Sequence, residues 1–176
     1  MRWEELFTAL EDDARGLERD ARDADFADRT RSAQAQVSWL MRCVRADLTL
    51  RVQGCGIVRG SVLRATPSWL LLRDRDSTDD TVVAVAAVTG VSGLASAAVD
   101  GAGIDRRLGW THAWRVLSRD RSDVRTTCVD GVVVRGVPVT VGSDYVELRE
   151  YDGGRPGRAR PVAVPYAAIA TVSSPR

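Results

Sequence analysis

One stretch of the sequence occurs twice, and this repetition constrains the fold more than any other feature. Val58–Gly60, read as Val-Arg-Gly, recurs as Val134–Gly136, 76 positions later. The correspondence extends without a gap over residues 47–74 and 123–150. Repetition at such a period indicates one structural element built twice. The sequence therefore predicts two similar halves of about 75 residues each.

Both halves show the period-two alternation of apolar and polar residues that is typical of half-buried strands. Gly60 and Gly136 lie inside the second expected strand of each half, where glycine marks a bend or a close backbone approach. We therefore expect five short strands in each half. They are expected at 47–53, 57–65, 69–72, 81–85 and 88–92, and again at 124–128, 132–139, 144–149, 161–164 and 169–173.

Residues 1–46 predict a long, highly charged helix. Trp3, Leu6, Phe7 and Leu10 recur at the spacing of one helical face. The apolar stripe is narrow, so the helix needs a partner. Two alternatives are open: a coiled coil that forms a homodimer through residues 1–46, or a helix folded back on the rest of the chain.

A second helix is expected at 105–118, after a flexible linker over 95–103. Its apolar residues Trp110, Trp114 and Leu117 share one face. The expected domains are therefore an N-terminal helix (1–46), a first set of strands (47–94), a linker and helix (95–122) and a second set of strands (123–176).

A helix followed by five strands, with a glycine bend in the second strand, resembles the Sm-like fold, a subclass of SH3-like barrels. The best local match is Asp130–Gly136 followed by Asp144–Leu148. The resemblance implies an α+β, mainly β, protein in which a long N-terminal helix precedes two tandem five-stranded SH3/Sm-like barrels joined by a helix. The layout is also similar to a tandem-barrel family of GC-rich bacteria, whose charged N-terminal helix starts near Trp-Glu-Glu-Leu-Phe.

The Sm resemblance implies RNA as a partner, because Sm proteins bind RNA, often as rings. The base-contacting Asn of Sm proteins has no counterpart, since Leu71 and Glu147 stand near its place and the chain contains no Asn. This departure argues against uridine-type recognition. The fused arrangement of two halves also argues against a ring of single domains.

Charge is balanced overall but uneven along the chain. All 25 basic residues are Arg, which is typical of a GC-rich genome, and the net charge is +1. Arg abundance alone therefore does not indicate nucleic-acid binding. Residues 105–176 carry 12 Arg and 8 acidic residues, net +4, whereas residues 1–46 carry net −2. The second half is better suited to meeting an anion.

Six side chains are the candidates for contact with nucleic acid. Three stand in a Gly/Pro loop without an acid between them, and three lie on the expected second helix. Basic groups placed in this way contact phosphates and make binding dependent on salt. The alternatives are a plain hairpin loop and a solvated helix face. The six are Arg155, Arg158 and Arg160 in the loop, and His112, Arg115 and Arg119 on the helix.

The sequence offers little for catalysis, metal binding or membrane insertion. His112 is the only histidine and has no carboxylate or cysteine pattern beside it. Cys43, Cys55 and Cys128 are odd in number and form no CxxC, which is typical of free thiols in a reducing cytosol. No signal peptide and no membrane-spanning run is recognised. We therefore expect a cytoplasmic protein that is not an enzyme, with no cofactor, no metal, no membrane and no small-molecule substrate.

Two functions remain open from the sequence. The first is a non-enzymatic, nucleic-acid-associated regulatory protein, RNA-linked, with duplicated Sm-like barrels. The second is a protein–protein adaptor or scaffold that dimerises through its N-terminal helix.

Overall fold

A computed structural model describes residues 38–74, 79–96, 104–105, 107–152, 155–156 and 160–174. Most of the expected N-terminal helix, residues 1–37, lies outside this part. At its described end the prediction is wrong, because Trp39–Arg42 form only a short 3-10 helix, η1. Arg45 takes a left-handed backbone conformation (φ 59°) that ends any helical path. The described residues contain neither a long helix nor a coiled coil.

The first repeat forms five strands close to the predicted positions. A 3-10 turn, η2 (Val85–Ala87), connects the fourth strand to the fifth. The strands are β1 (Asp47–Val52), β2 (Gly56–Ala65), β3 (Trp69–Arg73), β4 (Asp80–Ala84) and β5 (Val88–Ser92).

The second repeat follows the same path, with a 3-10 turn, η3 (Tyr166–Ala168), at the place of η2. A two-residue strand, β9 (Arg155–Pro156), pairs with the end of β8 in the longer loop of this repeat. The other strands are β6 (Val124–Cys128), β7 (Val133–Val141), β8 (Tyr145–Asp152), β10 (Val162–Pro165) and β11 (Ile169–Ser174).

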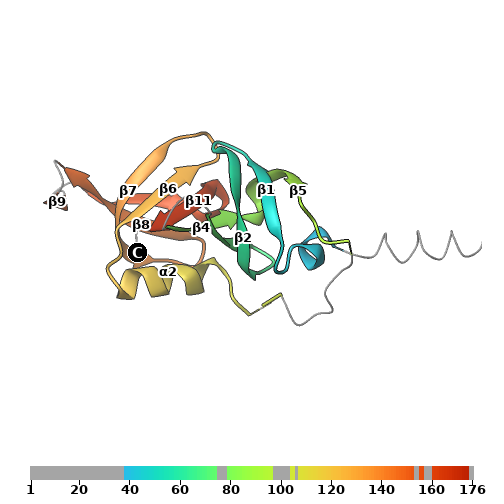
Figure 1. Ribbon diagram of the computed structural model, residues 1–176. Helices are drawn as coiled ribbons and strands as arrows, with labels where there is room; N and C mark the ends of the chain where they lie inside the picture. The colour runs from blue at the N-terminus through green and yellow to red at the C-terminus, as the bar shows by residue number, and fades with distance from the viewer. Residues whose placement is uncertain are drawn as a thin grey trace, which may run out of the picture. The chain divides into compact units, whose positions relative to one another are not determined.

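Ten strands form one continuous antiparallel sheet in the order β10-β8-β7-β6-β11-β4-β3-β2-β1-β5. Figure 1 labels most of these strands, with β1 and β5 of the first repeat at one end and β7 and β8 of the second at the other. The order β5-β1-β2-β3-β4 of the first repeat thus recurs as β11-β6-β7-β8-β10. The prediction of two five-stranded barrels is wrong. Closure of a barrel requires the fourth and fifth strands of one repeat to pair, but β4 pairs with β11 of the other repeat. Its main-chain groups find partners across the repeats instead of within one.

The helix between the repeats, α2 (Trp110–Arg119), starts later than predicted. Its apolar face turns inward as expected: Trp114 is fully buried, and Trp110 and Leu117 pack on the second core. Trp110 also packs against the first core and lies 6.4 Å from Trp114 between ring centroids. The helix therefore joins the cores of the two repeats.

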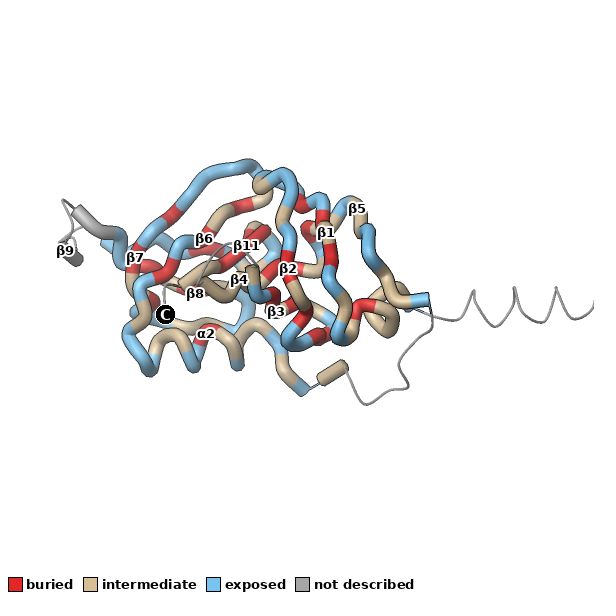
Figure 2. The backbone as a smooth tube through the Cα atoms, viewed as in Figure 1, coloured by how far each residue is buried: buried red, intermediate tan, exposed pale blue. Residues whose placement is uncertain are grey.

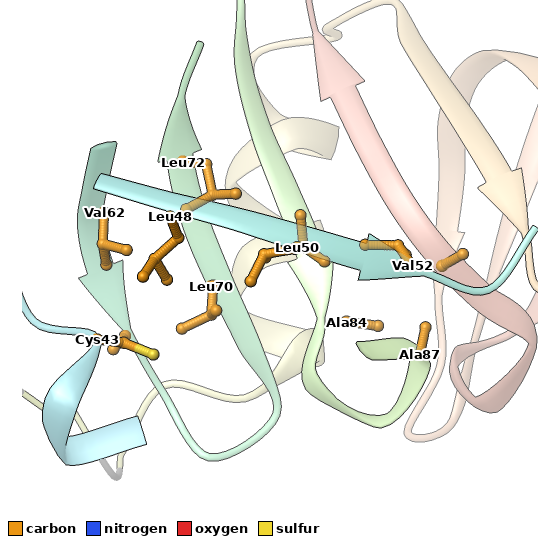
Figure 3. Packing of buried hydrophobic residues seen from close by; sticks show 12 residues of the cluster. Cys43, Leu48, Leu50, Val52, Val62, Leu70, Leu72, Ala84 and Ala87 are labelled. Atoms are coloured by element: carbon orange, nitrogen blue, oxygen red, sulfur yellow. The ribbon is translucent and has the colours of Figure 1, made fainter. Parts of the chain in front are cut away.

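Each repeat has its own hydrophobic core, and residues 39–176 form one compact unit (Figure 2). In the first core, Leu48, Leu50 and Val52 project from β1 towards Leu70 and Ala84 (Figure 3). These residues are the inward-facing set of the alternating pattern. Burial of each such side chain stabilises the fold by about 1.5–3 kcal/mol.

The repeated Val-Arg-Gly has the structural role that the sequence predicts. A Cβ atom on Gly60 would lie 2.5 Å from the carbonyl oxygen of Arg73, and one on Gly136 would lie 2.2 Å from that of Arg149. Only glycine permits this approach of neighbouring strands. The preceding residues Arg59 and Arg135 are exposed.

Candidate functional site

A polar groove of about 490 Å³ lies where the two repeats meet, and we call it the seam groove. Strands β4 and β11, which join the repeats, contribute Thr81 and Ser173 to its lining. Strand β2 contributes Arg59 from the first repeat, and β6 contributes Arg125 and Thr127 from the second. The groove is therefore made by tertiary structure from both copies of the repeated sequence.

A contact between two hairpin turns forms a second junction between the repeats, beside the groove. Gly54, in the β1–β2 turn, has φ +74°, and a Cβ atom there would lie 2.2 Å from the carbonyl oxygen of Cys128. The neighbouring Cys55 Sγ lies 3.3 Å from Thr171 Oγ1 on β11. Because Gly54 carries no side chain, the β1–β2 turn can press directly against the β6–β7 turn.

Arginines dominate the charge of the groove and its surroundings. Arg59 and Arg125 are exposed and form no ion pair with a described residue. Arg135 stands opposite Arg125 in the β6–β7 ladder, and Arg51 stands opposite Ile57 in the β1–β2 ladder. Directly opposed residues share a face of the sheet. One exposed face thus presents arginines from four strands.

Hydroxyl groups complete the polar lining. The lining that contains Arg59 and Arg125 also contains the hydroxyl groups of Thr81, Thr127 and Ser173. Asp74 adds one carboxyl group. Arginine and hydroxyl groups are the side chains that most often contact phosphate oxygens. None of the described residues that line the groove is aromatic, so this part of the chain offers no stacking platform for a base.

The first repeat has a hollow at the position equivalent to the seam groove, without described strands of another repeat beside it. A hollow of about 330 Å³, which we call the outer hollow, is lined by Thr49, Arg51, Ile57, Gly90, Val91 and Ser92. Five of these six positions correspond, in the second repeat, to residues that line the seam groove. The seam groove is thus the hollow of the second repeat, enclosed by strands of the first.

The structure brings three of the sequence-predicted site residues together on one element. His112, Arg115 and Arg119 are exposed at helical spacing on one face of α2. Arg160 is exposed just before β10. The backbone of Arg155 belongs to β9, whereas Arg158 lies outside the described residues.

The face of α2 and the seam groove are separate places. Trp114 of α2 and Val134 of β7 both belong to the second core. Val133, which precedes Val134 on β7, lines the groove. Successive residues of a strand point to opposite faces. Helix and groove therefore lie on opposite sides of β7. Sequence reasoning missed Arg59 as a site residue, although its outward position in the repeated Val-Arg-Gly was a usable signal.

Two of the three cysteine thiols are made harder to deprotonate by burial. All three cysteines are free thiols. Burial raises the pKa of the Cys43 thiol from 9.0 to about 11, against the opposing effect of Arg42. Burial also raises the pKa of Cys128, as does the neighbouring Asp130 carboxylate. These two thiols stay protonated at neutral pH, whereas the thiolate is the reactive form.

Neither a metal-binding cluster nor a membrane-spanning helix occurs among the described residues. Among them, no cluster of three or more His, Cys, Asp or Glu could hold a metal ion. None of the helices in that part of the chain has the length and apolar character to cross a membrane. Neither the protein-family models nor the curated proteins give a match to the sequence, so function is inferred from the site itself.

Proposed function

We propose that this protein is a non-enzymatic, nucleic-acid-associated protein that holds the sugar-phosphate backbone of a single strand in the seam groove. The observation that carries the proposal is the placement of Arg59 and Arg125 in one groove without an ion-pair partner among the described residues. A guanidinium group is always charged and binds phosphate oxygens through two parallel hydrogen bonds.

The surroundings of the two arginines support a backbone contact without reading of base sequence. Hydroxyl groups of Thr81, Thr127 and Ser173 can donate to phosphate or sugar oxygens. Arg51 and Arg135 extend the basic surface beyond the groove on the same face. Because the described lining holds no aromatic residue, binding rests on charge and depends only weakly on base identity.

We also propose that the protein acts in the cytoplasm. Three free cysteines, two of them buried, suit a reducing compartment.

The test is a titration of the full chain with a fluorescent single-stranded oligonucleotide, as RNA and as DNA, at two salt concentrations. Removal of both groove charges in Arg59→Gln/Arg125→Gln should weaken binding about tenfold. It should also reduce the slope of log K against log salt by about 1.4, since each phosphate contact to a single strand contributes about 0.7.

The matched control is Arg115→Gln/Arg119→Gln, which removes two exposed charges from α2 and leaves the net charge the same as in the groove variant. Its affinity should change by less than about twofold, because general attraction is screened beyond roughly 10 Å at moderate salt. Binding that is absent or independent of salt would contradict the proposed function. A larger loss in the α2 variant would move the contact to the helix.

A further inference from the structure

The continuous sheet ends in two edge strands, β5 of the first repeat and β10 of the second. Strand β5 holds the place in its repeat that β11 holds in the other, and β10 corresponds to β4 in the same way. The paired strands β4 and β11 therefore show what each free edge would accept, because equivalent strands present equivalent main-chain groups.

The direction of the main-chain groups of β4 follows from the hydrogen bond that begins η2. Val85 N–H donates to the carbonyl oxygen of Ser68 at 3.0 Å, in line with the β3–β4 ladder. Main-chain groups alternate in direction along an antiparallel strand. Val82 therefore turns its N–H towards β11, where it stands opposite Val172. By the same alternation, Asp80 and Ala84 turn their N–H groups to the same side of β4.

Strand β10 cannot repeat this pairing. Tyr166 N–H donates to the carbonyl oxygen of Asp144 at 2.7 Å, the counterpart of the bond made by Val85. The positions that turn outward are then Pro161, Ala163 and Pro165. Two of the three lack an N–H group, so the edge has lost most of its donors. Proline on an edge strand is a common barrier to association between sheets.

The hairpin turn of the second repeat adds a further obstacle. Gly54 makes the contact between the two turns because a Cβ atom there would lie 2.2 Å from the carbonyl oxygen of Cys128. Asp130 stands at the equivalent position of the second repeat and carries a side chain. The second repeat therefore cannot offer to another copy the surface that the first repeat offers within the chain.

Strand β5 shows the opposite character. Val91 corresponds to Val172, so its main-chain groups face outward. Val88–Ser92 contains no proline and no charged residue. Val88 and Val91 are only partly buried, whereas the equivalent Ile169 and Val172 are 1% and 2% exposed in the second core, against which Val82 of β4 packs. Among the described residues, the edge of β5 thus lacks the neighbouring strand that β11 has.

The outer hollow is also incomplete at this edge. It is lined by Gly90, Val91 and Ser92 of β5, and its counterpart becomes the enclosed seam groove only where the other repeat lies against it. Another strand beside β5 would therefore close the open side of the hollow as well as pair the edge.

We propose that β5 pairs with β5 of a second copy of this chain, antiparallel, about a twofold axis at Val91. The edge of β10 is excluded by its prolines, and the other strands of the path already have neighbours on both sides. The pairing of like with like joins two uncharged edges and buries Val88 and Val91 of both copies. It consumes the free edge of each copy, so assembly stops at two.

The test measures the mass of the full chain in solution by light scattering after size exclusion, together with sedimentation over a range of concentrations. Wild type should have twice the chain mass of 19.1 kDa. Val91→Pro removes an outward N–H from each copy at the twofold axis, and should raise the dissociation constant by at least about tenfold. Ala163→Pro makes the same change on β10 and should leave the dimer intact.

Hydrogen exchange of the wild-type amides measures the same pairing without a substitution, in case Val91→Pro folds poorly. In wild type, the amide of Val91 should become more protected as protein concentration rises, whereas the amide of Ala163 should not. A monomeric wild type at all concentrations would overturn the proposal. So would a dimer that survives Val91→Pro with its fold intact, or one that dissociates with Ala163→Pro.

Discussion

The two repeats share a backbone path and differ at the surfaces that they turn outward. Strand order, the glycine bend and the 3-10 turn before the last strand recur in both. In the first repeat, β4 pairs with the other repeat and β5 stays at the edge. In the second, the roles are reversed. The position of a strand within the sheet therefore depends on a few edge residues, not on the repeated pattern.

The equivalent strands β4 and β10 differ most clearly in the number of main-chain N–H groups that face away from their own repeat. The outward positions of β4 are Asp80, Val82 and Ala84, each with an N–H group, and β4 lies inside the sheet. At the same positions β10 has two prolines around Ala163, and it lies at the edge. A strand can be interior only if its donors serve both neighbours.

The largest expected difference between the repeats comes from proline at these equivalent positions. Val82→Pro removes the N–H that faces β11 and should reduce the free energy of unfolding by about 3 kcal/mol or more. Ala163→Pro, on the outward side of β10, should reduce it by less than about 1 kcal/mol. Urea unfolding of both variants measures the difference. Equal losses would show that β10 also has a strand beside it.

The contact between the hairpin turns should have the next largest effect. Gly54 and Gly56 both have positive φ, +74° and +80°, but a Cβ atom on Gly56 would have nothing within 4 Å. Gly56→Ala should therefore cost only the backbone strain, about 1–2 kcal/mol.

Gly54→Ala adds a clash with the carbonyl oxygen of Cys128 and should cost about 2 kcal/mol more than Gly56→Ala, within the range for overpacked sites. Thermal and urea unfolding of the pair isolate the clash from the strain. If the two variants are equally stable, the turns do not press against each other. The side chain of Asp130 would then be no obstacle to such a contact in the second repeat.

The smallest expected effect concerns a thiol in the first core. The pKa of Cys43 is about 11 in the folded protein against an ordinary 9.0. Its contribution to stability is full below pH 9.0 and is lost as the pH rises towards 11, because the unfolded chain releases the proton first. Wild type should lose stability in this window, and Cys43→Ala should lose less.

Urea unfolding at pH 8, 9.5 and 10.5 measures these slopes. Cys128 and Tyr166, whose pKa values are also raised by burial, contribute to the slope of both proteins and so cancel in the comparison. An identical slope in Cys43→Ala would show that the thiol does not remain protonated in the first core.

Local structure could be predicted from the sequence almost throughout the described repeats. Strands Val88–Ser92 and Val124–Cys128 have the bounds that the alternation predicts, and the inward face of α2 follows from the spacing of Trp110 and Trp114. These features depend on which side chains are buried, and burial leaves a periodic signal over a few residues.

The candidate site could not be predicted in this way. Arg59 and Arg125 are 66 positions apart and belong to different repeats. The density of charge along the chain indicates Arg155, Arg158 and Arg160 and the basic residues of α2 as candidates. It could not indicate two arginines that only the pairing of β4 with β11 brings to one groove.

The repeat itself therefore determined much, but not the architecture. The sequence determined two copies of a five-strand path, each bent at a glycine, because alternation and the absence of a side chain act locally. Only the tertiary structure decided that the copies share one sheet and enclose a groove. Both closure of each barrel and pairing across the repeats satisfy the same main-chain groups, so the choice depends on contacts between residues far apart in the chain.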